Sequence, residues 1–218
     1  MYLPKHFEES SPETLHAFID QHPLATIVVG GEAGLAADHI PLFLRRDADI
    51  HGELIGHVAR ANPLSQKAAG GIDCLILFHG QQHYISPNWY ATKAETGKAV
   101  PTWNYEVVHV QGKLFAMDDP VWLRACLTEL SARHERTQAK PWTLDEAPAE
   151  YIDNMLKAIV GIRVEITSMV GKAKLSQNQP PANRKSVIDA LSAFGDEASL
   201  AMAEAIRRQS NDRRDGHN

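Results

Sequence analysis

Two short segments far apart in the chain each place a cation among hydrogen-bonding residues, directly after an apolar run typical of a strand. They read "GHVARANPL" at 56–64 and "GKAKLSQNQP" at 171–180. An arginine offers a planar fork of donors and a lysine a compact charge, while amides and hydroxyls add neutral donors. Because a phosphate needs donors from more than one direction, the sequence predicts a joint anion site if the fold brings the segments together. Its candidate ligands are Arg60, Asn62, Lys174, Ser176, Gln177 and Asn178.

A purely structural role for the same residues is also compatible with their spacing. Asn62 and Pro63 have the types expected at the cap and first position of a short helix, whose unpaired amides would favour an anion near Arg60. Alternatively, Asn62 is a helix cap only, and Arg60 and Lys174 are solvated charges at strand ends. Residue types and spacing leave both interpretations open.

Aromatic residues gather around a long segment with two prolines, "SPNWYATKAETGKAVPTWN" at 86–104. Long loops in compact domains are often functional. Aromatic rings with polar handles suit a planar ligand or a subunit interface, but they could equally pin the loop to the fold. Tyr84 is expected in the core, whereas both roles stay open for Trp89, Tyr90, Trp103 and Tyr105.

The elements that must position these residues are short strands interrupted by helices. Apolar runs predict strands at 24–30, 35–46, 53–59, 73–80, 83–87, 105–117 and 160–175. A polar turn is expected at 47–49. Capping residues and helical apolar spacing predict helices at 12–22, 62–71, 120–135, 147–159, 184–194 and 197–209.

The spacing of the strands favours an antiparallel arrangement. Strands between 24 and 59 follow one another too closely for the helical crossovers of a parallel sheet. The pattern therefore predicts an α+β fold, built on a small, mainly antiparallel barrel with peripheral helices. We expect one domain at 1–182, followed at 183–218 by a C-terminal helical extension with a polar tail.

Composition narrows the possible functions. The chain has 218 residues and a formal net charge of −5, which argues against broad attraction to a nucleic-acid backbone. The N-terminus has no apolar stretch of a signal peptide and no run could span a membrane, so we expect a cytoplasmic protein. No CxxC or HExxH pattern suggests a metal site, and Cys74 and Cys126 are expected to be buried thiols.

Several longer blocks resemble one known family. They include "MYLPKHFEE", "GHVARANP", "YISPNWY", "VPTWNYEVVHVQGKL" and "GKAKLSQNQP", which are similar, in this order, to the motifs of the PaiB-type FMN-binding negative transcriptional regulators. The resemblance extends from Met1 to about Arg184. It implies a split β-barrel of the pyridoxamine 5′-phosphate oxidase kind, a homodimer, and FMN bound in the cleft between subunits.

The resemblance also implies which residues meet the flavin. Arg60 and Asn62 would bind its phosphate, and the segment with Lys174 would supply a second arm. The backbone of 57–59 would line the ring or the ribityl chain, and Thr102 and Asn104 would hydrogen-bond a flavin edge or a substrate. The implied cofactor-binding residues, beyond the six phosphate ligands above, are His39, Ile40, Pro41, His57, Val58, Ala59, Thr102, Trp103 and Asn104.

Three functions remain open at this point. The first is a flavin-binding regulator, although direct DNA contact by the last two helices is disfavoured because the second is rich in alanine. The second is an FMN-dependent oxidoreductase, similar to flavin reductases, or a haem-handling protein, since some related split barrels bind haem. The third is a dimeric flavin carrier or sensor without turnover.

Overall fold

The computed structural model describes residues 1–31, 34–46 and 51–215, and they form two compact units. The first unit comprises Met1–Ser11, His79–Val108 and Val170–Asn218, and the second comprises Pro12–Phe78 and His109–Met169. Each unit is assembled from segments that are separate in the sequence. The division into domains at 1–182 and 183–218 stays a prediction.

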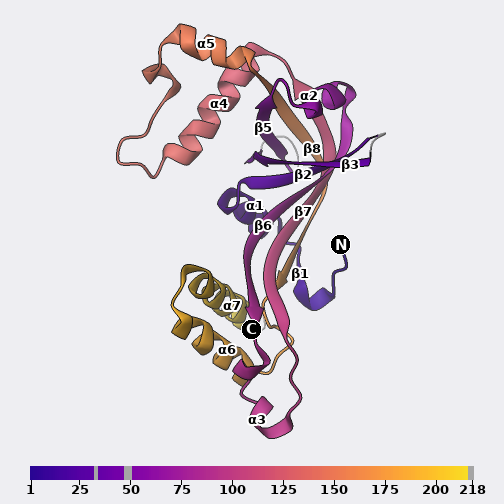
Figure 1. The fold of residues 1–218 in the computed structure, drawn as a ribbon, viewed down its shortest axis with the longest axis vertical. Coiled ribbons are helices and arrows are strands. Elements are labelled where there is room, and N and C mark those ends of the chain that lie inside the picture. The colour runs from indigo at the N-terminus through magenta and orange to yellow at the C-terminus, as the bar shows by residue number, and fades with distance from the viewer. Residues whose placement is uncertain (32–33, 47–50, 216–218) are drawn as a thin grey trace. The chain divides into compact units, whose positions relative to one another are not determined.

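The described residues form eight strands and seven α-helices, as the predicted α+β class requires (Figure 1). The strands are β1 (Glu8–Glu9), β2 (Leu24–Gly31), β3 (Gly34–Pro41), β4 (Phe43–Arg45), β5 (Glu53–Ala59), β6 (Ile72–Ile85), β7 (Thr102–Met117) and β8 (Ile159–Lys174). The helices are α1 (Pro12–Gln21), α2 (Pro63–Lys67), α3 (Lys93–Thr96), α4 (Pro120–Glu135), α5 (Ala149–Lys157), α6 (Pro181–Phe194) and α7 (Glu197–Asp215).

The strands pair in the order β3-β2-β6-β7-β8-β5-β4, and β1 pairs with β8. The neighbours of β2 and β5 run antiparallel to them, with Thr26 opposite His39 and His57 opposite Gly161, for example. The predicted antiparallel sheet is therefore confirmed. The three long strands β6, β7 and β8 each contribute residues to both units.

Three predicted strands differ from the structure. The strand expected at 35–46 is divided into β3 and β4 at Leu42, whose N–H donates to the carbonyl of Pro23 at 2.8 Å. A Cβ on Gly56 would lie 2.8 Å from the Pro41 carbonyl oxygen, so glycine permits this bend to approach β5. The strands expected at 73–80 and 83–87 join into β6, and the turn expected at 47–49 lies outside the described residues.

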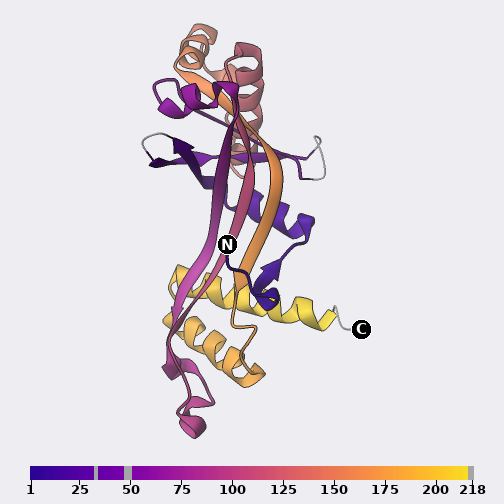
Figure 2. The ribbon, with the colours of Figure 1, turned by 90° about the vertical axis from the view of Figure 1, so that its right-hand side faces the viewer.

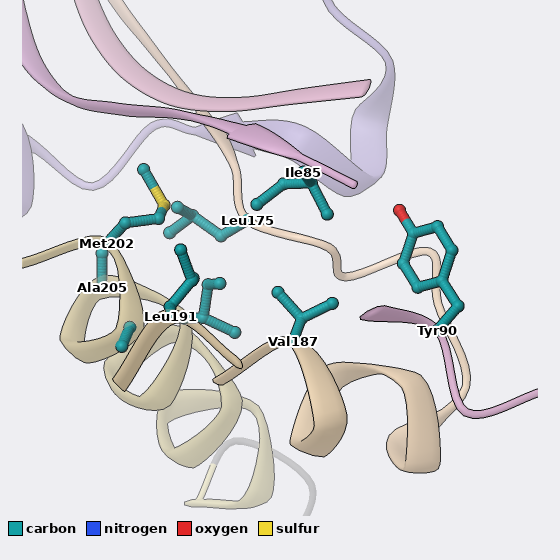
Figure 3. Close-up of a cluster of buried hydrophobic side chains, with 9 residues drawn as sticks. Ile85, Tyr90, Leu175, Val187, Leu191, Met202 and Ala205 are labelled. Atoms are coloured by element: carbon teal, nitrogen blue, oxygen red, sulfur yellow. The ribbon is translucent and has the colours of Figure 1, made fainter. Parts of the chain in front are cut away.

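The core of the first unit lies between the strand ends and a helical hairpin. Helices α6 and α7 pack on each other and are joined at Gly195, which has a φ of +74° (Figure 2). Figure 3 shows Ile85 and Leu175 facing side chains of both helices. The buried cluster consists of Ile85, Tyr90, Leu175, Val187, Leu191, Met202, Ala203, Ala205 and Ile206.

The core of the second unit includes the contact of α4 with α5 and with the sheet. Leu123 of α4 packs with Ile152 and Leu156 of α5, and Cys126 packs with Phe43 and Ile55 of the strands. Helix α4 starts where the sequence predicts, because the Asp119 carboxylate accepts a hydrogen bond from the N–H of Val121 at 2.8 Å. Both cysteines are buried, as expected.

Candidate functional site

Arg60, the first predicted phosphate ligand, is held by the chain itself at the end of β5. Its guanidinium forms a bidentate ion pair with Asp118, at N–O distances of 2.7 and 2.6 Å. It also donates to the carbonyl oxygens of Lys157 at 2.7 Å and Ile159 at 3.0 Å. These bonds engage most of the N–H donors of the guanidinium. Arg60 therefore ties β5 to the ends of β7 and α5 and to the start of β8.

The ion pair shifts the pKa of both partners. A hydrogen bond to Asp118 raises the pKa of Arg60, and the same bond lowers the pKa of Asp118 below its ordinary value. Both groups are exposed, so solvent screens the pair. A phosphate at Arg60 would have to displace or share the bonds that Asp118 now makes.

Asn62 caps helix α2, as the sequence predicts. Its side-chain oxygen accepts a hydrogen bond from the N–H of Leu64 at 2.8 Å. Its amide nitrogen donates to the Asp38 carboxylate on β3, also at 2.8 Å. Both ends of the Asn62 amide are thus used within the second unit.

The remaining residues predicted on β3 and β5 also belong to the second unit. Ile40 and Val58 point into the core, with exposed fractions of 5% each, so only their backbone is available to a ligand. His39 is exposed, and its Nδ1 lies 3.0 Å from the hydroxyl of Thr26. His57 is half-buried; burial lowers its pKa, and its Nδ1 is a buried atom without a hydrogen-bond partner among the described residues. Pro41 and Ala59 are exposed.

In the first unit, side chains on three strand ends alternate between two faces. His83 on β6 contacts Ser199 of α7 at 3.1 Å, and Glu106 on β7 lies 3.7 Å from Arg208 of α7. Ala173 on β8 packs against the buried cluster. Their immediate neighbours in each strand lie on the opposite face. That face carries Tyr84, Trp103, Tyr105, Lys172 and Lys174, which we call the aromatic–lysine face.

The aromatic–lysine face is exposed and its side chains contact one another. Tyr84 and Trp103 meet edge to face with ring centroids 6.2 Å apart, and they are 43% and 53% exposed. The expectation that Tyr84 lies in the core is therefore wrong. The Lys172 ammonium lies 5.3 Å from the ring centroid of Tyr105. Lys174 is half-buried and donates a hydrogen bond to the hydroxyl of Thr102.

Asn104 and Ser176 are buried, and alternation along β7 places Asn104 on the same side as Glu106, opposite the aromatic–lysine face. The Asn104 amide nitrogen donates to the Ser176 hydroxyl at 2.9 Å, and its Oδ1 is a buried atom without a hydrogen-bond partner among the described residues. Ser176 has a φ of +64°, in the left-handed region that non-glycine residues rarely adopt. Backbone strain of this kind is concentrated at binding and catalytic sites.

The other two residues of this segment have separate roles. The side-chain oxygen of Gln177 accepts from the N–H of Leu175 at 2.6 Å, and its amide nitrogen donates to the carbonyl of Ala173. The side chain of Gln177 therefore stabilises the turn that contains it. Asn178 is exposed.

The predicted ligands thus fall into two groups, one in each unit. The second unit holds the residues from β3, β5 and the following turn, and the first unit holds those from β7 and β8. Because Arg60 and Lys174 belong to different units, the joint phosphate site stays a prediction. Sequence reasoning missed Lys172, although alternation along "GKAK" already places it on the same side of its strand as Lys174.

The part of the chain that the structure describes has neither a membrane-spanning helix nor a metal-binding cluster. No helix there is both long enough and apolar enough to cross a membrane. No group of three or more His, Cys, Asp or Glu side chains there could hold a metal ion.

The chain is similar to known proteins over nearly its whole length. It is 30% identical to the "Protease synthase and sporulation protein PAI 2" of Bacillus subtilis, over 94% of this chain and 96% of that protein. Its fold matches the "FAD and Heme binding protein" of Mycobacterium smegmatis with a TM-score of 0.54, at 17% identity, covering 77% of this chain and 73% of that one. It matches the flavocytochrome Anf3 of Azotobacter vinelandii with a TM-score of 0.55, at 14% identity, covering 79% of this chain and 72% of that one.

At these low identities the structural matches establish the fold only. That fold is the split barrel that the sequence resemblance implied. Family membership is established by sequence similarity. A family model with the description "Putative FMN-binding domain" matches residues 1–168, and the chain belongs to that family.

Proposed function

We propose that this protein binds FMN and that the aromatic–lysine face of the first unit contacts the cofactor. The observation that carries the proposal is the exposed pairing of Tyr84 with Trp103, on the strand face to which alternation also assigns Lys172 and Lys174. Soluble proteins rarely leave large aromatic rings exposed together without a partner. Flat rings beside positive charge suit a ligand that has a planar ring system and a phosphate.

The chemistry of the donors fits FMN in particular. Lys174 donates one N–H to the Thr102 hydroxyl, and the ammonium has two further N–H donors that a phosphate could accept. FMN supplies hydride or electron transfer when bound, and the protein binds and orients it.

The second unit contributes to the same proposal through Arg60 and the backbone of β5. Arg60 is exposed at the end of β5, the strand that carries His57, and the buried Nδ1 of His57 has no hydrogen-bond partner among the described residues. Membership of the FMN-binding family supports a role for this segment, because residues 56–64 lie within the matched region. We propose that Arg60 exchanges part of its bonding with Asp118 for the flavin phosphate.

The assembly and cellular role follow from the family resemblance. We propose a cytoplasmic homodimer whose flavin affects transcription, in line with the resemblance to PaiB-type regulators and to the sporulation protein of Bacillus subtilis. Regulation without direct DNA contact agrees best with helix α7, whose first turn carries Glu197 and no arginine.

Equilibrium binding to the purified protein tests the cofactor. FMN, riboflavin, FAD and haemin are titrated separately, and the protein is scanned for a flavin spectrum that appears in the supernatant after denaturation. We expect saturable FMN binding that is tighter than riboflavin binding, and a loss of affinity in Trp103→Ala with little change in stability. Haemin as the only tight ligand would refute the FMN assignment in favour of haem.

A pair of variants tests Arg60. If Arg60 binds phosphate, Arg60→Ala weakens FMN binding, whereas Asp118→Ala leaves it unchanged or strengthens it because the guanidinium is released. If Arg60 serves only as a structural clasp, both variants lower the unfolding midpoint by similar amounts and neither changes the ratio of FMN to riboflavin affinity.

An FMN-dependent oxidoreductase is the second candidate, supported by the fold shared with a flavocytochrome. Bound flavin that is reduced by NADH or NADPH with multiple turnovers would favour it. Reduction by neither donor, together with intact FMN binding, would favour a regulator or sensor.

A further inference from the structure

A cluster of arginines lies in the second unit, apart from every residue that was predicted to contact flavin. Arg45 ends β4, Arg46 follows it, and Arg133 lies near the end of α4. These three line a cavity of about 310 Å³ together with Asp20, Leu44 and Glu129. We call it the arginine pocket.

A second cavity of about 270 Å³ adjoins the arginine pocket and shares Asp20 and Arg133 with it. It adds an apolar wall that includes Pro23 and Phe43, and a further cation, Arg136. Phe43 is 4% exposed, and the guanidinium of Arg133 lies over its ring, 4.8 Å from the centroid. The two cavities together pair a cationic end with an apolar end, which is the usual composition of a small-molecule site.

The walls carry an excess of positive charge in a chain whose net charge is −5. Four guanidinium groups face two carboxylates across the two cavities. Burial acts to raise the pKa of Glu129, but hydrogen bonds from Arg133 and Arg45 outweigh it and hold that pKa below its ordinary value. Glu129 is therefore ionised at neutral pH, and the surplus of two positive charges matches a dianion.

The arginines of the pocket, unlike Arg60, keep guanidinium N–H donors that are not engaged in the hydrogen bonds found among the described residues. Arg45 bonds Glu129 at 2.9 Å through Nη2, and Arg46 bonds Asp20 through Nη2; no other hydrogen bond of either guanidinium is found in the described part of the chain. Arg133 is anchored more firmly, by Glu129 at 2.8 Å and the carbonyl of Leu44 at 3.2 Å. Asp20 and Glu129 thus hold the guanidiniums at the rim while leaving N–H groups for a ligand.

We propose that the arginine pocket binds a small phosphate monoester, with the phosphate among Arg45, Arg46 and Arg133 and its organic group against Phe43. Three guanidiniums from two elements suit the several oxygens of a tetrahedral phosphate better than the two oxygens of one carboxylate. The site is separate from the proposed flavin contacts and does not depend on them. It gives the protein a second ligand, through which a phosphorylated metabolite can act as an effector.

Phenyl phosphate is the probe, because it joins a phosphate to a ring that fits beside Phe43. Isothermal titration of the full chain is expected to show saturable binding of phenyl phosphate, with benzoate and phenol at least about tenfold weaker, the minimum for losing one charge-assisted hydrogen bond. Arg45→Gln and Arg46→Gln should each weaken phenyl phosphate by about tenfold or more for the same reason. Arg124→Gln, on α4 like Arg133 but paired with Asp153, is the control and should bind normally.

Asp20→Asn gives a test of opposite sign. Removing this carboxylate releases Arg46 and takes away a repulsive charge, so phenyl phosphate should bind more tightly than to the wild type. The proposal is overturned if phenyl phosphate shows no saturable binding, if benzoate binds as well, or if Arg45→Gln and Arg46→Gln bind like the wild type. Loss of FMN binding in the same two variants would also overturn it, because the pocket would then belong to the flavin site.

Discussion

Lys174 gives the sharpest prediction for the proposed flavin contact. Its ammonium donates one hydrogen bond to Thr102, the residue that precedes Trp103 in β7. A hydrogen bond to a charged group contributes about 1.5–3 kcal/mol. Lys174→Ala should therefore weaken FMN binding by roughly 10-fold to 150-fold, since about 1.4 kcal/mol corresponds to a factor of ten.

Comparison of FMN with riboflavin isolates the phosphate. Riboflavin has the same ring and ribityl chain without the phosphate, so Lys174→Ala should leave riboflavin binding unchanged and remove most of the preference for FMN. Flavin fluorescence titration measures both constants. Lys185→Ala is the matched control, because this lysine lies in the same unit outside the aromatic–lysine face and its ammonium pairs with Asp189 at 2.7 Å. Equal losses for FMN and riboflavin, or an equal effect of both variants, would refute a phosphate contact by Lys174.

The remaining predictions concern stability and reactivity. Leu191→Ala removes a fully buried side chain and should lower the free energy of unfolding by about 2–5 kcal/mol in urea titrations. Burial raises the pKa of Glu106 despite the nearby Arg208, so the folded state favours the protonated acid and loses stability as pH rises through that pKa. Glu106→Gln should therefore stabilise the protein at pH 7 and have little effect below about pH 4, where the acid is protonated in both states; equal effects at both pH values would contradict this. Burial raises the thiol pKa of Cys74 to about 11 and of Cys126 to about 12, so a thiol reagent at pH 8 should label them only on unfolding, as mass spectrometry would show.

The parts of the fold that depend on local chemistry could be predicted from the sequence. Pro120 after an aspartate begins α4, and Asn62 caps α2, because a cap needs only residues a few positions apart. The apolar run at 24–30 forms β2, and this prediction too depended only on residues that are close together in the sequence. The break at Leu42 was missed, because it depends on a bond to Pro23, nineteen positions away in the chain.

The candidate site was predictable in its residues but not in their partners. Arg60 was identified as a cation at a strand end. Its bonds to Asp118 and Ile159 could not be predicted, because they join positions far apart in the sequence and no local pattern indicates them. The folding back of the Gln177 side chain onto its own strand depends on the left-handed backbone at Ser176. That backbone conformation is unusual for serine, so residue type could not indicate it.

Each of the two units is formed by segments that are separate in the sequence, and this limits how the chain can be shortened. The region that defines the family ends at residue 168, whereas Leu175, Val187 and Met202, which fill the core beside Ile85, all come later. A truncation at 168 would keep the family signature but expose Ile85 and remove Lys174 from the end of β8. A shortened protein for crystallisation or binding work therefore needs the C-terminal hairpin, even though the hairpin lies outside the matched region.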